Sequence, residues 1–177
     1  MADASHLKEE GLRLFHDGAY SEALAHFELA LQAFQQEGQM LEAAEMLNNI
    51  GVIHRMEGRL SEAADKLEQA RIAFAESGDR NREAQTLGNL APIYSKQGDI
   101  EKAIETYRLA ASIFAELNDK NRQGEVLMAL GLLQFDKGQR AAGLASYESG
   151  LMLISNPTPR QKRLRQMLKL RKSLLGG

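Results

Sequence analysis

The chain has 177 residues, of which 44% are hydrophobic and 26% charged, a composition that excludes a largely disordered or collagen-like protein. It contains no cysteine, which excludes a disulfide framework, a cysteine-ligated zinc site and a thiol nucleophile. The net charge of −2 divides into −9 over residues 1–159 and +7 over residues 160–177, and the acidic body argues against a broad nucleic-acid-binding surface.

A period of 40 residues runs through most of the chain. Glycines recur at this spacing, at Gly18, Gly58, Gly98 and Gly138. Six further columns keep the same register, one of them formed by Gly11, Gly51, Ala91 and Gly131. A fixed period of this length is typical of repeat architectures in which each copy forms one supersecondary unit. We therefore expect four repeats, at about 4–39, 40–79, 80–119 and 120–155.

Each repeat carries two stretches in which apolar residues recur at helical spacing. In the second repeat one stripe comprises Leu47, Ile50, Gly51 and His54, and strand-type alternation is absent. The mid-repeat glycines are placed where a left-handed residue ends one helix before the next begins. In chain order this predicts helices at about 4–17, 20–37, 40–57, 60–77, 80–97, 100–117, 120–137 and 140–155. A single hairpin cannot bury both of its apolar faces, so the copies are expected to stack into a solenoid.

The third repeat carries a recognisable pattern. It reads Leu87-x2-Leu90-Ala91-x2-Tyr94, followed by Ala103-x3-Tyr107. This pattern resembles the tetratricopeptide repeat family, and the period of 40 resembles its long-repeat branch, which includes Pins-type and kinesin-light-chain-type repeats. The resemblance implies an all-α fold, a right-handed α-solenoid of four hairpins whose first helices line a concave groove.

The repeat pattern stops after residue 155, and residues 156–177 are expected to form a breaker and a final basic amphipathic helix. Thr158 and Gln161 form a predicted capping box, with Pro159 at the first helical position. The helix is predicted at about 159–174, with a stripe that consists of Leu164, Met167, Leu168 and Leu175. We interpret it as a cap over the last repeat. The alternative is a basic helix that binds an anionic membrane or nucleic acid.

The sequence shows no catalytic signature. No two of the four histidines form an i, i+4 pair, and no phosphate loop or nucleophile elbow is present. His54 takes the column of Tyr94, so we interpret it as a packing residue with a satisfied hydrogen bond. We therefore expect a protein that is not an enzyme and that carries no cofactor and no metal.

The resemblance implies which columns face the groove. The candidate peptide-binding residues are Lys8, Leu12, Asn48, Asn49, Val52, Arg55, Gln85, Gly88, Asn89, Pro92, Lys96 and Leu132. Leu12, Val52, Pro92 and Leu132 would form an apolar line for the side chains of an extended peptide. Asn49 and Asn89 would pair with the peptide backbone, since an amide both donates and accepts. The other interpretation is that these two asparagines bond neighbouring helices.

Pro92 lies inside a predicted helix and cannot donate to the carbonyl of Gly88. We expect a kink between these two residues that opens the carbonyl toward the groove.

These patterns favour a non-enzymatic adaptor that binds a protein or peptide partner. One alternative is a self-associating structural module, which would gain weight if two of Leu7, Leu12, Leu14 and Phe15 were exposed. The other is binding of an anionic polymer or lipid by the final helix. Neither a nucleic acid nor a membrane is the expected partner. The first residues lack the basic and apolar segments of a signal peptide, so we expect a cytoplasmic location.

Overall fold

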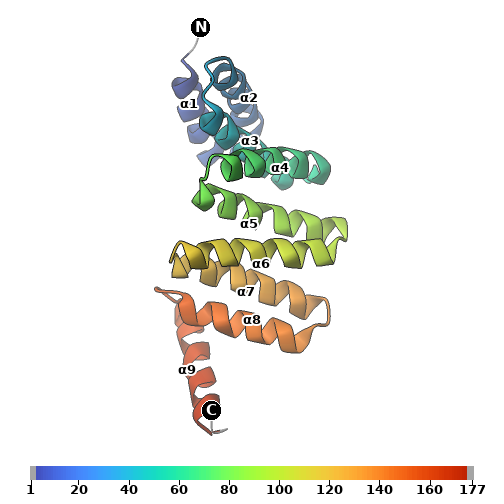
Figure 1. Ribbon diagram of the computed structural model, residues 1–177, viewed down its shortest axis with the longest axis vertical. Coiled ribbons are helices and arrows are strands. Elements are labelled where there is room, and N and C mark those ends of the chain that lie inside the picture. Colours follow the sequence, from blue (N-terminus) through green and yellow to red (C-terminus); the bar gives the residue numbers. More distant parts are fainter. Residues whose placement is uncertain (1–2, 175–177) are drawn as a thin grey trace. The chain divides into compact units, whose positions relative to one another are not determined.

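The structure is a computed structural model that describes residues 3–174, apart from the side chains of Lys169 and residues 171–174. The chain divides into two compact units, Met1–Asp99 and Ile100–Gly177. All secondary structure in the described part is helical (Figure 1). The predicted all-α fold is confirmed, and each unit is described below by itself.

The first unit contains five helices in sequence. They are α1 (Ala4–His16), α2 (Tyr20–Gln36), α3 (Met40–Met56), α4 (Leu60–Glu76) and α5 (Arg80–Gln97). Consecutive helices pack against one another as hairpins. The core between α2 and α3 is fully buried and includes Phe27, Phe34, Met46, Ile50 and Ile53. Burial of these large side chains is the main source of stability for a helical hairpin stack.

The second unit contains four helices in its described residues. They are α6 (Ile100–Glu116), α7 (Lys120–Asp136), α8 (Arg140–Leu153) and α9 (Pro159–Leu174). Helices α7 and α8 approach each other closely because glycines face each other between them, and a Cβ on Gly124 would lie 2.7 Å from the Gly150 carbonyl oxygen. Each observed helix boundary in the two units lies within two residues of its prediction.

The turns between helices explain why these boundaries were predictable. After α3, Gly58 adopts a left-handed φ of 80°, and the amide of Arg59 bonds the carbonyl of His54 at 2.9 Å. This arrangement pairs carbonyls that the helix end would leave without a partner. After α6 the same place is taken by Asn118, with φ 57°. Asparagine is the residue besides glycine that most readily adopts this conformation.

Helix α9 begins at the predicted capping box and packs on α8. The Thr158 amide donates to Gln161 Oε1 at 2.8 Å, and the Gln161 amide donates to Thr158 Oγ1 at 3.3 Å. Arg165 donates to the carbonyl oxygens of Leu151 and, at 2.7 Å, of Ile154. Leu168 is buried, while Met167 is 66% exposed.

The predicted apolar stripe of α9 is therefore only partly buried. Leu164 is half-buried, and Met167 turns away from α8 rather than toward it. Leu175, the last residue of the predicted stripe, lies outside the described residues. Among the described helices none is both long enough and apolar enough to cross a membrane.

Candidate functional site

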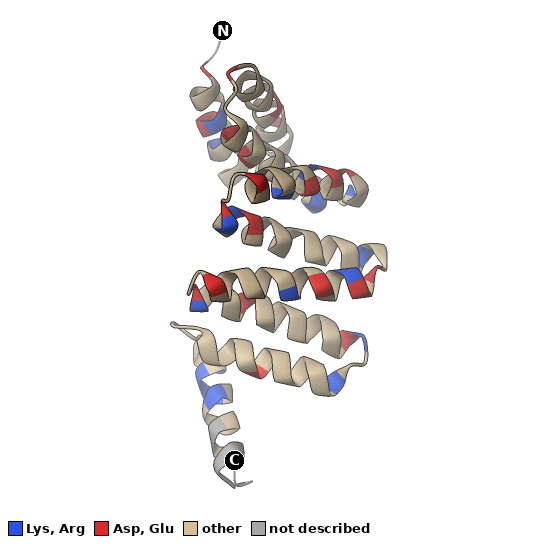
Figure 2. Cartoon of the chain, in the orientation of Figure 1, with Lys and Arg blue, Asp and Glu red and all other residues tan. Residues whose placement is uncertain are grey.

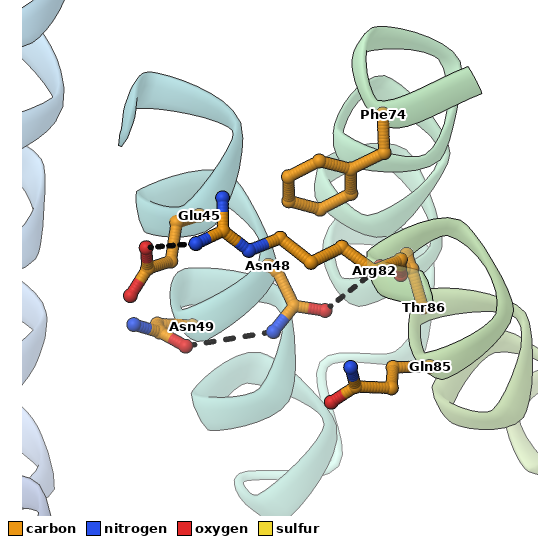
Figure 3. A pocket seen from close by; sticks show the side chains of 7 residues that line it. All are labelled: Glu45, Asn48, Asn49, Phe74, Arg82, Gln85 and Thr86. Carbon is orange, nitrogen blue, oxygen red and sulfur yellow. Dashed lines mark hydrogen bonds and ion pairs between the residues drawn. The ribbon is translucent and has the colours of Figure 1, made fainter. Parts of the chain in front are cut away.

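In the first unit, the carboxylate of Glu45 links α1, α3 and α5, each of which is the first helix of its repeat. On α3, Glu45 Oε2 forms an ion pair with Lys8 Nζ of α1, at 2.8 Å. The same Oε2 atom lies 3.6 Å from Arg82 Nη2 on α5 (Figure 3). About a quarter of the Lys8 and Glu45 side chains is exposed. Lys8, one of the predicted peptide-binding residues, is thus already paired within the protein.

A polar hollow of about 220 Å³ lies between α3 and α5 (Figure 3). It is lined by Glu45, Asn48, Asn49, Phe74, Arg82, Gln85 and Thr86. The guanidinium of Arg82 also lies over the Phe74 ring, with its Cζ 5.8 Å from the ring centroid. This contact and the Glu45 ion pair hold the cation at the wall of the hollow.

Asn48 is the centre of the hydrogen bonds in this hollow. Its Oδ1 accepts from Thr86 Oγ1 at 3.3 Å and from Asn89 Nδ2 at 3.4 Å, both on α5. Its Nδ2 donates to Asn49 Oδ1 at 3.5 Å. Asn89 therefore bonds a neighbouring helix, as the second interpretation of the asparagines expects. Its Nδ2 is partly committed before any ligand arrives.

An apolar hollow of about 120 Å³ adjoins the polar one, between α1, α2 and α3. Its lining residues are Leu12, Phe15, His16, Phe27, Asn49 and Val52. Phe27 is fully buried, whereas Leu12 and Val52 are half-buried. The structure thus brings together two members of the predicted apolar line and places Asn49 on the wall of both hollows.

Asn49 and Arg55 keep polar atoms without partners at this surface. The Nδ2 of Asn49 and the Nε of Arg55 are buried and have no hydrogen-bond partner among the described residues. An unsatisfied buried donor destabilises the folded state by about 1–3 kcal/mol unless it finds an acceptor. Asn49 lines the apolar hollow, whereas Arg55 lies one turn beyond Val52 on the same helix, α3, and is not one of the lining residues.

The remaining predicted residues on α5 lie outside the two hollows, except Gln85. Gln85 is exposed and donates to Asn81 one turn earlier. Gly88 borders open space, since a Cβ there would meet no atom within 4 Å. Pro92 is half-buried and Lys96 exposed, and α5 continues as a helix through Pro92. Leu132 belongs to α7 of the second unit, where it is 62% exposed.

The lining residues that sequence reasoning missed include Thr86, Arg82, Phe74 and Phe27. Thr86 carried a usable signal, because its column holds the apolar residues Met46 and Val126 in the neighbouring repeats. A polar residue in an apolar column indicates a buried hydrogen bond. The roles of Arg82 and Phe27 depend on side-chain direction and have no comparable signal in the sequence.

The exposure expected of a self-associating first helix is not found. Leu7, Leu12, Leu14 and Phe15 are all half-buried and pack against the core of the first unit. The Phe15 ring meets Tyr20 edge-on at 5.6 Å between centroids.

His54 is buried as predicted, but the expected satisfied hydrogen bond is wrong. Its Nδ1 has no hydrogen-bond partner in the part of the chain that the structure describes, and the carboxylate of Glu57 is 4.0 Å away. Burial lowers the pKa of this histidine, and the positive charge of Arg59 lowers it further. No cluster of three or more His, Asp or Glu side chains suited to a metal occurs among the described residues.

The stacked helical hairpins define the molecule as a helical repeat protein. Proteins of this class generally serve as interaction modules. The model of the tetratricopeptide repeat family matches residues 11–76. The model of the soluble NSF attachment protein family, SNAP, matches residues 56–151, which is more than half of the chain. The chain belongs to the soluble NSF attachment protein family, and its repeats are of the tetratricopeptide kind.

Solved structures share the fold at low sequence identity. BtubC (BKLC) from P. vanneervenii is 22% identical, with a TM-score of 0.63 over 89% of this chain and 73% of that one. MamA is 18% identical, with a TM-score of 0.65 over 85% of this chain and 78% of that one. No curated protein sequence matches the chain.

Proposed function

We propose that the protein is a non-enzymatic adaptor that binds an extended segment of a partner protein on the surface formed by α1, α3 and α5. The observation that carries this proposal is that two adjoining hollows, one apolar and one polar, share Asn49. An extended peptide alternates its side chains and carries a polar backbone between them. It therefore needs an apolar site and a backbone partner side by side.

The apolar hollow suits an aliphatic side chain. Its volume of about 120 Å³ is somewhat less than that of an engineered protein cavity that holds benzene, about 150 Å³. The buried Asn49 Nδ2 would donate to a peptide carbonyl and gain the acceptor it lacks in the protein. The neighbouring guanidinium of Arg55 would attract a carboxylate or a further carbonyl.

Selection of peptides from a random phage-displayed library tests this proposal. The parent chain should enrich peptides that share an aliphatic position, and a synthetic consensus peptide should bind measurably by calorimetry. Val52→Trp fills the apolar hollow and should weaken this peptide at least about tenfold, the equivalent of about 1.4 kcal/mol. Asn49→Ala combined with Asn89→Ala should also weaken binding.

A matched control separates occlusion of the site from general damage. Ile72 on α4 is 46% exposed and does not line either hollow, so Ile72→Trp should leave peptide binding unchanged. Both variants should keep the helical circular-dichroism spectrum of the parent. Failure to enrich any shared aliphatic position, or equal binding by parent and Val52→Trp, would overturn the proposal.

A further inference from the structure

Helix α9 is fixed along one face and presents the opposite face outward. The guanidinium of Arg165 bonds two carbonyl oxygens at the end of α8, and Leu168 is buried beside it. Met167 and Leu170, three residues apart, are 66% and 62% exposed. Because residues three apart share a helix face, these two apolar side chains form one outward patch.

The outward patch is flanked by positive charge. Arg160 and Arg163 are exposed and, with Leu164 and Met167, line a shallow depression on the helix surface. Figure 2 shows the described lysines and arginines of α9 with no acidic residue among them. The sequence from residue 149 onward contains no aspartate or glutamate at all. The helix therefore combines an exposed apolar patch with cations that have no acidic residue on the same helix.

An apolar patch beside cations suits some anionic partners better than others. The phosphate backbone of a nucleic acid would satisfy the arginines but would leave Met167 and Leu170 without an apolar partner. A specific protein interface needs about 800 Å² from each side, to which two exposed apolar side chains contribute a small part. An anionic bilayer accepts apolar tips among its acyl chains, and each nearby cation adds to the attraction.

We propose that the outer face of α9 is a docking surface for anionic lipid bilayers. Met167 and Leu170 enter the boundary between headgroups and acyl chains, while Arg160 and Arg163 lie against the lipid phosphates. The Arg165 contacts hold α9 on α8, so the protein docks through a preformed helix. Our sequence analysis favoured a cap over the last repeat for this helix, with binding to an anionic membrane as the alternative; the exposure of Met167 and Leu170 favours the alternative for the outer face. The proposal is independent of peptide binding on the first unit.

A tryptophan reporter tests the docking directly, because the chain contains no tryptophan. In Met167→Trp, the emission should shift to shorter wavelength when vesicles of mixed phosphatidylcholine and phosphatidylserine are added. Vesicles of phosphatidylcholine alone should cause no shift, and high salt should reverse the shift. Met56→Trp, at a 48% exposed position on α3, is the matched control and should not respond to either vesicle.

Charge-neutralised variants complete the test in the Met167→Trp background. Arg160→Gln with Arg163→Gln should weaken the vesicle partition coefficient roughly 30-fold, given about 1 kcal/mol for each cation near the surface. As a control, Lys66→Gln with Lys96→Gln removes the same net charge from the first unit and should change the vesicle partition coefficient little. The proposal is overturned if mixed vesicles cause no shift, if neutral vesicles act equally, or if the two pairs behave alike. Displacement of bound chain from mixed vesicles by short duplex DNA at equal phosphate would also overturn it.

Discussion

Gly131 on α7 and Gly143 on α8 face each other backbone to backbone. A Cβ on Gly131 would lie 2.6 Å from the carbonyl oxygen of Gly143, and a Cβ on Gly143 would lie 2.7 Å from that of Gly131. In the first unit, Gly51 holds the same column as Gly131, but a Cβ there would first meet the Leu67 side chain, at 2.7 Å. A side chain can move to relieve such a clash, whereas two helix backbones cannot do so without separating.

We expect Gly131→Ala to lower the free energy of unfolding by about 1–3 kcal/mol, because the added methyl group forces α7 and α8 apart. Gly88→Ala is the matched control, since Gly88 is also inside a helix but faces open space. There the higher helix propensity of alanine should raise the free energy of unfolding by about 1 kcal/mol. Urea denaturation followed by circular dichroism measures both changes. Equal effects of the two substitutions would contradict the backbone contact.

Tyr94 ties α5 to α4 through a hydrogen bond to a carboxylate. Its hydroxyl donates to Glu68 Oε1 at 2.5 Å, and Glu68 Oε2 lies 2.6 Å from Arg71 Nε. Burial and the Glu68 carboxylate raise the pKa of Tyr94. Tyr94→Phe should lower the free energy of unfolding by about 1.5–3 kcal/mol, as expected for a hydrogen bond to a charged group. In a Glu68→Gln background the same substitution should have a smaller effect, and an equal effect would argue against the bond.

His54 should make stability depend on pH. Because burial lowers its pKa in the folded chain, the unfolded chain binds a proton more readily below the ordinary histidine value of about 6.5. The stability associated with neutral His54 is therefore present above pH of about 6.5 and is lost as the pH falls toward the lowered pKa. His54→Gln should flatten the decrease in thermal midpoint over this window. Identical pH profiles for parent and variant would refute the assignment.

The helix boundaries were predictable because most helices end at a single glycine in the left-handed conformation. Gly58 and Gly98 stand in one column, and both adopt positive φ at a helix end. The division after Asp99 has no such mark, since the 40-residue period passes through Gly98 unchanged. Local backbone preference can be read from residue type, whereas the compactness of a unit depends on contacts between distant side chains.

The candidate site was predictable to the level of helix faces. The resemblance to the tetratricopeptide repeat family placed Leu12, Asn49 and Val52 on one surface, and these residues line one hollow. Spacing could not show that Glu45 draws Lys8 inward, because that depends on how long side chains are directed across helices. For the same reason the hydrogen bond from Asn89 to Asn48 was only one of two interpretations.

Pro92 provides the last prediction, because α5 continues through it without a break. Proline offers no N–H to the carbonyl of Gly88, and inside a helix it is about 3 kcal/mol less favourable than alanine. Gly88 borders open space on the side where a Cβ would point. The kink between the two residues stays a prediction, which a crystal structure would measure as a change of helix axis.

Pro92→Ala restores the missing donor and should raise the free energy of unfolding by about 1–3 kcal/mol. A decrease would show that the distorted helix is required for packing. The affinity of the selected peptide then separates two roles of the Gly88 carbonyl: it falls in Pro92→Ala if this oxygen accepts from the ligand, and stays constant if water satisfies it.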